Sequence, residues 1–327
     1  MDQVKEITKA EFFQVQKEKE ELAEELNGLK LYFSELEATN NHLVSATWRE
    51  RDMKKKLAET IGELNSTKII LDNQNRRITE SINYSKKIQS AINPTEEDIR
   101  KHHPNSFMLY MPKDVISGDF PWTHENGDNF YIASVDCTGH GVPGAMMSMI
   151  GNLLLKQIVN EEVVHEPSVI LKKLHDAVVK TLRQDESNSN SNDGMDIGLC
   201  RINKTKNEIS FSGAHRPLFL MRNNEIEVIS GDKFPIGGMH YRGKNNYSDF
   251  VFNYLKGDSI FLFTDGLPDQ VGGSENKKLM TKNLKLFLQA NAHLAMEPLK
   301  NELSAFLTNW KGDNKQVDDI LIIGINF

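Results

Sequence analysis

Aspartates at strand ends and tight turns are the residues of this 327-residue sequence whose types and spacing could do chemistry. Four positions share this setting: Asp119, Asp136, Asp265 and Asp318, with Asp319 directly after the last of them. Oxygen ligands without a Cys/His spacing suit hard cations such as Mg²⁺ or Mn²⁺. Two such ions held by shared carboxylates would activate a water for in-line attack on a phosphoryl group. Any one of these aspartates alone also fits a solvated turn, but four in one domain favour a site.

The stretch from residue 130 to 159 predicts a strand, a glycine-rich turn and a helix. Residues 130–135 are β-branched and aromatic, as in a buried strand, and residues 145–159 have apolar side chains at helical spacing. The turn between them contains Gly139, Gly141 and Gly144, which lack a Cβ and let the backbone approach a ligand closely. The start of the helix would favour an anion such as phosphate. By itself this pattern also fits a purely structural corner.

Composition limits the classes of function. The length allows two domains. The net charge of −7 provides no basic field that would attract nucleic acid or an acidic membrane. Cys137 and Cys200 form no disulfide framework, which suits a reducing compartment, and Cys137 reads as a small buried residue. No apolar run approaches the roughly 20 residues of a membrane span, and the first residues lack a signal-peptide core. We therefore expect a cytoplasmic protein without membrane insertion.

Residues 1–93 predict a long coiled-coil helix. All ten prolines lie at Pro94 or later, and charges of both signs are mixed throughout this part. A stripe at every seventh residue is mostly apolar: Val15, Leu22, Leu29, Leu36, Leu43, Glu50, Leu57, Leu64, Leu71, Ile78, Ser85 and Ile92. The companion stripe is interrupted by polar residues, including Asn40, Asn75 and Gln89. Leucine at d with occasional asparagine at a favours a parallel dimer, whereas a helix lying on its own domain would show a wider stripe.

The break at Asn93-Pro94 predicts the end of this helix, because proline disfavours the α conformation of the preceding residue. Residues 94–327 then form a second domain, joined to the helix without a flexible linker. Strands are expected at 107–111, 130–135, 195–202, 207–212, 217–221, 226–229, 249–254, 258–264 and 318–325, and helices at 143–160, 167–183, 277–290 and 296–309. Hairpins with helices grouped between them favour an α+β fold of antiparallel sheets flanked by helices.

Six short motifs, in order, carry a resemblance to a known family. They are PKDVISGDF at 112–120, DCTGHG at 136–141, SGAHRP at 212–217, FPIGG at 234–238, FTDG at 263–266 and VDDI at 317–320. Over residues 104–327 the chain resembles the bacterial metal-dependent serine/threonine protein phosphatases of the SpoIIE and RsbU type, which are related to eukaryotic type 2C (PP2C) enzymes. The resemblance implies an α-β-β-α sandwich with two Mn²⁺ or Mg²⁺ ions at one end.

The resemblance also implies roles for particular residues. Asp136 would bridge both metals, and the backbone carbonyl of Cys137 would be a further ligand. Asp119 would bind one metal or orient its water, whereas Asp265 and Asp318 would hold the other.

Other positions remain open in the sequence. Asp319 could be a ligand or support one. His140 could be a general acid or pack the glycine turn, and Lys113 is a positional candidate for gripping phosphate, since the arginine of the eukaryotic relatives has no certain counterpart. Structural roles are equally open for His215 and Arg216. Asp193 and Asp196 could contribute to a third metal site, which most bacterial members lack.

The function implied is hydrolysis of phosphoserine or phosphothreonine on a bacterial signalling protein, such as an anti-sigma-factor antagonist, regulated through a homodimeric coiled coil and an upstream sensor protein. One alternative is a catalytically weak scaffold that binds a partner through the same two parts. A nucleotide-binding protein is a poorer fit, because the glycine turn lacks the Gly-Lys-Ser/Thr of a P-loop.

Overall fold

The computed structural model describes residues 9–160, 166–186, 191–238 and 246–327. The chain divides into two compact units, Met1–Arg77 and Ile78–Phe327. Helix α1, Lys9–Ile92, supplies the described part of the first unit, and its last turns belong to the second. The predicted helix end before Pro94 is confirmed.

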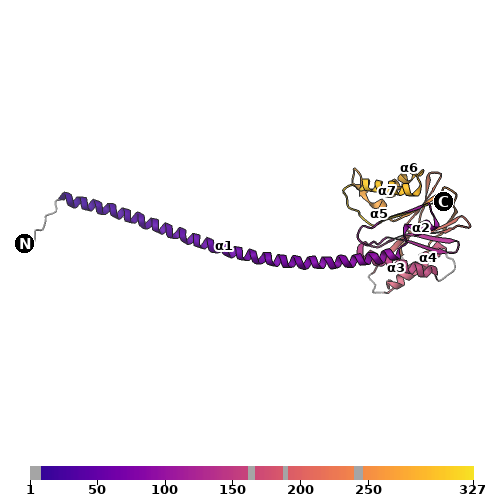
Figure 1. The fold of residues 1–327 in the computed structure, drawn as a ribbon, viewed down its shortest axis with the longest axis horizontal. Coiled ribbons are helices and arrows are strands. Elements are labelled where there is room, and N and C mark those ends of the chain that lie inside the picture. Colours follow the sequence, from indigo (N-terminus) through magenta and orange to yellow (C-terminus); the bar gives the residue numbers. More distant parts are fainter. Residues whose placement is uncertain (1–8, 161–165, 187–190, 239–245) are drawn as a thin grey trace, which may run out of the picture. The chain divides into compact units, whose positions relative to one another are not determined.

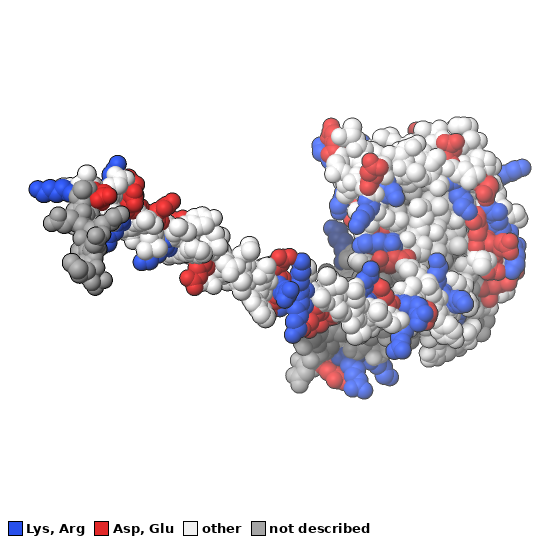
Figure 2. Space-filling model, turned by 60° about the vertical axis from the view of Figure 1, so that its left-hand side comes forward, with Lys and Arg blue, Asp and Glu red and all other residues white. Residues whose placement is uncertain are grey.

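Within the first unit, α1 exposes both its charges and its apolar stripe. Ion pairs one turn apart join Lys17 to Glu21, Lys54 to Glu50 and Lys56 to Asp52. Figure 2 shows both signs of charge interspersed along the visible face of the helix. Stripe residues such as Leu22, Leu57 and Leu64 are 58 to 67% exposed in the single chain. A second helix would bury them, so the coiled-coil dimer stays a prediction.

The second unit is built on two antiparallel sheets (Figure 1). The first has the order β1-β13-β10-β6-β7, formed by Ser106–Met111, Ile320–Asn326, Ser259–Phe263, Leu218–Arg222 and Glu225–Ile229. The other has the order β2-β3-β4-β5-β9, formed by Phe120–Asn126, Asn129–Cys137, Gly194–Asn203, Glu208–Ala214 and Phe250–Asn253, with the short β8, Ile236–Gly237, on β4. A hairpin of β11, Val271–Gly272, and β12, Lys277–Lys278, completes the strands.

Helices cover the outer face of each sheet, so the predicted α-β-β-α sandwich is confirmed (Figure 1). The helices of this unit are α2, Glu96–His102; α3, Gly141–Asn160; α4, Pro167–Thr181; α5, Gly266–Asp269; α6, Met280–Ala290; and α7, Met296–Lys311. One core lies between the β3 sheet and α3 and α4, and a second lies between the β10 sheet and α6 and α7. A third fills the space between the sheets.

Strand β10 shows why the central strands read as unbroken apolar runs. Side chains alternate between the two faces of a strand. Ile260 and Leu262 enter the core between the sheets, whereas Phe261 and Phe263 enter the core under α6 and α7. Both faces are buried, and no polar alternation marks the strand in the sequence.

Six elements of the described chain were missing from the sequence prediction, namely α2, β2, β8, α5, β11 and β12. Helix α2 begins at a capping box, in which Thr95 and Asp98 accept each other's backbone N–H groups. Strand β2 includes Pro121, and it is tolerated because β2 lies at a sheet edge. Proline obscured the pattern at both places, since Pro94 directly precedes the capping box and Pro121 lies within β2. The other four elements have only two to four residues each.

Among the described helices, α3 alone is long and apolar enough to cross a membrane by length and composition. Half of its most apolar segment is buried inside the second unit. This burial is the pattern of a core helix.

Candidate metal centre

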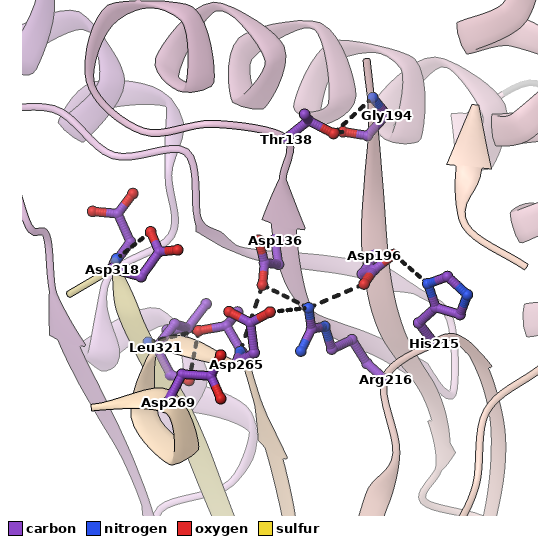
Figure 3. Close-up of polar contacts among 12 residues, drawn as sticks. Asp136, Thr138, Gly194, Asp196, His215, Arg216, Asp265, Asp269, Asp318 and Leu321 are labelled. Atoms are coloured by element: carbon purple, nitrogen blue, oxygen red, sulfur yellow. Dashed lines mark hydrogen bonds and ion pairs between the residues drawn. The ribbon is translucent and has the colours of Figure 1, made fainter. Parts of the chain in front are cut away.

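The predicted aspartates come from the ends of both sheets and meet at one end of the sandwich. Asp136 lies near the end of β3, and its partner in the register with β4 is Asp196. Asp265 follows β10 and caps α5, and Asp318 precedes β13. Asp119 directly precedes β2. Figure 3 shows Asp136, Asp196, Asp265 and Asp318 around a common space.

An open pocket of about 270 Å³ lies at this end. Four aspartates line it, namely Asp136, Asp196, Asp265 and Asp318, together with Arg216 and the turn residues Cys137, Thr138 and Gly139. Its volume suits a phosphoryl group with small ions rather than a large organic ligand.

Asp119 is a buried carboxylate with a free oxygen. The residue is 3% exposed, and its Oδ2 has no hydrogen-bond partner among the described residues. Burial raises the pKa of Asp119 well above its usual range, the negative charge of Asp136 raises it further, and a hydrogen bond with Thr264 opposes the shift. A buried, unpartnered carboxylate oxygen next to a second carboxylate is the arrangement that a divalent cation relieves.

Asp136 and Asp318 are perturbed in the same direction. Burial raises the pKa of Asp136 to about 7, with Asp265 and Asp196 adding to the shift and Arg216 opposing it. Burial is also the main cause of the raised pKa of Asp318, and the charge of Asp265 contributes. These carboxylates destabilise one another's charged forms, as expected where a cation belongs.

Both carboxylate oxygens of Asp319 accept hydrogen bonds from backbone N–H groups. Its Oδ1 accepts a hydrogen bond from the N–H of Lys113 at 2.7 Å, and its Oδ2 accepts one from the N–H of Gly118 at 2.8 Å. The residue is 2% exposed. Asp319 therefore connects the loop before Asp119 to the start of β13 and supports the site in this way. Lys113 takes part in this connection through its backbone N–H.

Glycine is required where this loop meets the turn after Asp136. A Cβ on Gly118 would lie 2.4 Å from the carbonyl oxygen of Gly139, and one on Gly144 would lie 2.2 Å from the same atom. Only residues without a side chain permit this approach. The glycines thus place Asp119 against the turn that carries Asp136 and Cys137.

The predicted histidines lie at the rim. His140 Nδ1 is 2.8 Å from Asp114 Oδ2, and both side chains are about half exposed. His215 Nδ1 is 3.0 Å from Asp196 Oδ1. Cys137 is buried, and its thiol pKa is raised well above its usual range by burial and then by Asp136. Its thiol is therefore unsuited to act as a nucleophile, although Cys137 lines the pocket.

Arg216 has the central position in the pocket, which the sequence left open. Burial opposes its charge, but Asp136, Asp265 and Asp196 outweigh that effect and raise the guanidinium pKa above its usual range. Asp196, considered above only for a third metal site, is instead part of this central cluster. Asp193 lies outside it and accepts at its backbone carbonyl a hydrogen bond from Gln184. Strand pairing, which a single sequence does not display, brings Asp196 to Asp136.

Gln89, in the last turns of α1, contacts the loop that leads to Asp119, and the sequence analysis did not predict this contact. Its Nε2 donates to Ser117 O at 2.7 Å and to Ser148 Oγ at 2.9 Å, and its Oε1 accepts from Ser117 N–H at 3.1 Å. The side chain is 6% exposed. The helix end is thereby bonded to the residue two positions before Asp119. The only indication in the sequence was that Gln89 is a polar residue in the companion heptad stripe.

The residues fit divalent oxygen-loving cations in chemistry and charge. The donors are all oxygens, and the free Oδ2 of Asp119 lies beside the charge of Asp136. In the part of the chain that the structure describes, no three His, Cys, Asp or Glu side chains are arranged as they stand to hold one ion. The guanidinium of Arg216 lies among three of these carboxylates, within 3.0 Å of an oxygen of Asp136, Asp196 and Asp265.

The profile of the family described as Stage II sporulation protein E (SpoIIE) matches residues 126–327. The chain belongs to the SpoIIE family. The SiaA-PP2C domain of Pseudomonas aeruginosa is 27% identical in sequence and superimposes with a TM-score of 0.70, covering 77% of this chain and 98% of that domain. No curated protein sequence matches the chain significantly.

A second solved structure shows the fold alone. It contains the PP2C phosphatase domain and a regulatory fragment of SpoIIE from Bacillus subtilis, at 15% identity and a TM-score of 0.52, covering 68% of this chain and 61% of that one. The family resemblance expected from the motifs is confirmed, and the second unit has the fold of PP2C-type phosphatase domains.

Proposed function

We propose that this protein is a Mn²⁺- or Mg²⁺-dependent phosphatase that hydrolyses phosphoserine or phosphothreonine on a bacterial signalling protein. The observation that carries the proposal is the cluster of aspartates around the pocket, with Asp119 buried and one of its oxygens unpartnered. Two divalent ions bound there would supply the charge that activates water and offsets negative charge on the phosphoryl group. Membership of the SpoIIE family supports the same class of activity.

In this proposal the chain holds the ions with oxygens from both sheets. Asp136 and the carbonyl of Cys137 lie at the end of β3, and Asp265 and Asp318 face them from β10 and β13. Asp119, directly before β2, would bind one metal or orient its water, and its loop is held by Asp319. His140, paired with Asp114 at the rim, is available to protonate the serine or threonine oxygen as it leaves the phosphorus. The substrate is an anti-sigma-factor antagonist or a similar partner-switching protein.

We further propose that the enzyme works as a parallel homodimer in the cytoplasm, with a sensor protein acting on the coiled coil. The exposed apolar stripe of α1 supports the dimer. The hydrogen bonds of Gln89 to Ser117 support regulation, since they connect the helix end to the loop that carries Asp119. The two described cysteines are buried and unpaired, which suits a reducing compartment.

Hydrolysis of a generic phosphomonoester by the full chain, with and without Mn²⁺, tests the activity. Turnover that requires Mn²⁺ and is lost in Asp265→Ala would support the phosphatase. If the full chain is silent, the fragment 78–327, which keeps Gln89, decides between inhibition by the coiled coil and absence of activity. Silence of both, with Mn²⁺ bound, would contradict the proposal and favour the binding scaffold.

A further inference from the structure

The guanidinium of Arg216 lies where the carboxylates of the candidate metal centre converge (Figure 3). Its Nη2 is 2.9 Å from Asp136 Oδ2, 3.0 Å from Asp196 Oδ2 and 2.8 Å from Asp265 Oδ2. The nitrogen donates hydrogen bonds to Asp196 and Asp265, and its contact with Asp136 is ionic. One nitrogen therefore contacts three carboxylates.

This position conflicts with a bound divalent ion. Mg²⁺ requires its oxygen ligands at about 2.0–2.1 Å. An ion held by Asp136 Oδ2 and Asp265 Oδ2 would lie between the same oxygens that Nη2 now contacts at 2.9 and 2.8 Å. Two cations at such close range would repel each other strongly. The arginine and the metal cannot both use this pair of carboxylates in the same geometry.

The arginine is attracted into the cluster mainly by charge. Its Nε is buried and has no hydrogen-bond partner among the described residues. Asp196, which contacts Nη2 through one oxygen, is held through the other by His215. A guanidinium with one well-paired nitrogen and one buried, unpaired nitrogen is poorly matched to its surroundings. If a divalent cation neutralised Asp136 and Asp265, the guanidinium would lose most of the electrostatic attraction that holds it between them.

Resting on the proposed function, we propose that Arg216 is a built-in counter-ion that holds the metal-free centre together and competes with the divalent cation for Asp136 and Asp265. When the metal binds, the guanidinium leaves these two carboxylates and stays in the pocket lining, tethered near Asp196. There its planar fork is suited to a phosphate group. Arg216 thus sets the metal concentration at which the centre assembles, and it supplies the phosphate-binding group that the sequence did not identify.

Direct metal binding tests this proposal without relying on activity. Mn²⁺ is titrated calorimetrically into the full wild-type chain, Arg216→Gln and the control Arg222→Gln. Arg222 is a matched control because it also pairs with a buried carboxylate, Asp258, which does not line the pocket. We expect Arg216→Gln to bind Mn²⁺ at least tenfold more tightly and to have a lower Tm without metal. The control should keep the wild-type Kd.

The outcomes separate the two proposals. Unchanged or weaker Mn²⁺ binding by Arg216→Gln, while the wild type binds, would overturn the counter-ion and leave the phosphatase intact. Absence of Mn²⁺ binding by every form would overturn both. A purely structural arginine would lower the Tm with and without metal and would not tighten binding.

Arg216→Lys serves if the glutamine variant does not fold. The lysine keeps a positive charge, so we expect its Mn²⁺ affinity to remain within about threefold of the wild type. Tenfold tighter binding by the lysine variant would show that the charge at position 216 does not compete with the metal, and would overturn the proposal.

Discussion

Replacing Gln89 with methionine should loosen the loop that carries Asp119. Methionine keeps a long, flexible side chain but removes the amide, which leaves the N–H and carbonyl of Ser117 without the partners they have at 3.1 and 2.7 Å. Ser148 keeps its own bond to the carbonyl of Ala145 at 2.9 Å. Two backbone groups therefore lose their partners, at about 1–3 kcal/mol each when buried. Since water can reach a loosened loop, we take about 2 kcal/mol as the local effect.

Hydrogen exchange of the full chain measures this effect locally. A loss of about 2 kcal/mol corresponds to roughly 30-fold faster exchange, because 1.4 kcal/mol is a factor of ten. The faster exchange should be confined to peptides covering Ser117 to Asp119, and Mn²⁺ affinity should fall with it. Lys87→Met, on the same helix but exposed, is the control. Unchanged exchange at Ser117 in Gln89→Met would refute the mechanical link between α1 and the centre.

Three further predictions concern the centre and the helix. Asp136→Asn should abolish Mn²⁺-dependent hydrolysis while leaving the circular dichroism spectrum intact, because it removes charge from a ligand position and not apolar packing. The pKa of Asp136, about 7 when folded, lies above the value of about 3.9 for unfolded aspartate, so the native state binds more protons. The metal-free Tm should therefore rise as the pH is lowered from about 8 to about 5, and a Tm that falls over this range would contradict the raised pKa. Leu64→Ala and Leu71→Ala should each weaken the dimer by a few kcal/mol, measured by sedimentation equilibrium, whereas an unchanged dimer would place the interface elsewhere.

The sequence predicted antiparallel sheets flanked by helices because local patterns determine most of the strands, helices and turns. Apolar runs such as Ile260 to Phe263 mark strands buried on both faces, and glycines such as Gly144 mark turns that need close backbone contact. The positions of Asp136 and Asp265 at strand ends could be seen in the same way. Their approach to each other depends on two sheets packing face to face, which only the family resemblance suggested.

The arrangement at Arg216 and Gln89 could not be predicted from local pattern. Arg216 reaches three aspartates that lie 20, 49 and 80 positions away in the sequence, and its partners are fixed by strand register and not by spacing. Gln89 has the position of a polar residue in a coiled-coil seam, where it would ordinarily face a second helix. In the structure it faces the chain's own domain.

The last turns of α1 can therefore pack either against the chain's own second unit or against a second helix, but not against both. Ile82 and Ile92, like Gln89, belong to the seam, and all three are at least partly buried within the second unit, whereas stripe residues farther up the helix are exposed. If a dimeric coiled coil extended to its final turn, Gln89 would have to leave Ser117, and the loop before Asp119 would keep only its anchor to Asp319. Rotation or extension of the coiled-coil seam would then displace the loop before Asp119, because it would break the two hydrogen bonds between Gln89 and Ser117. A sensor that changed only the last turn of the coiled coil could regulate the enzyme without touching its pocket.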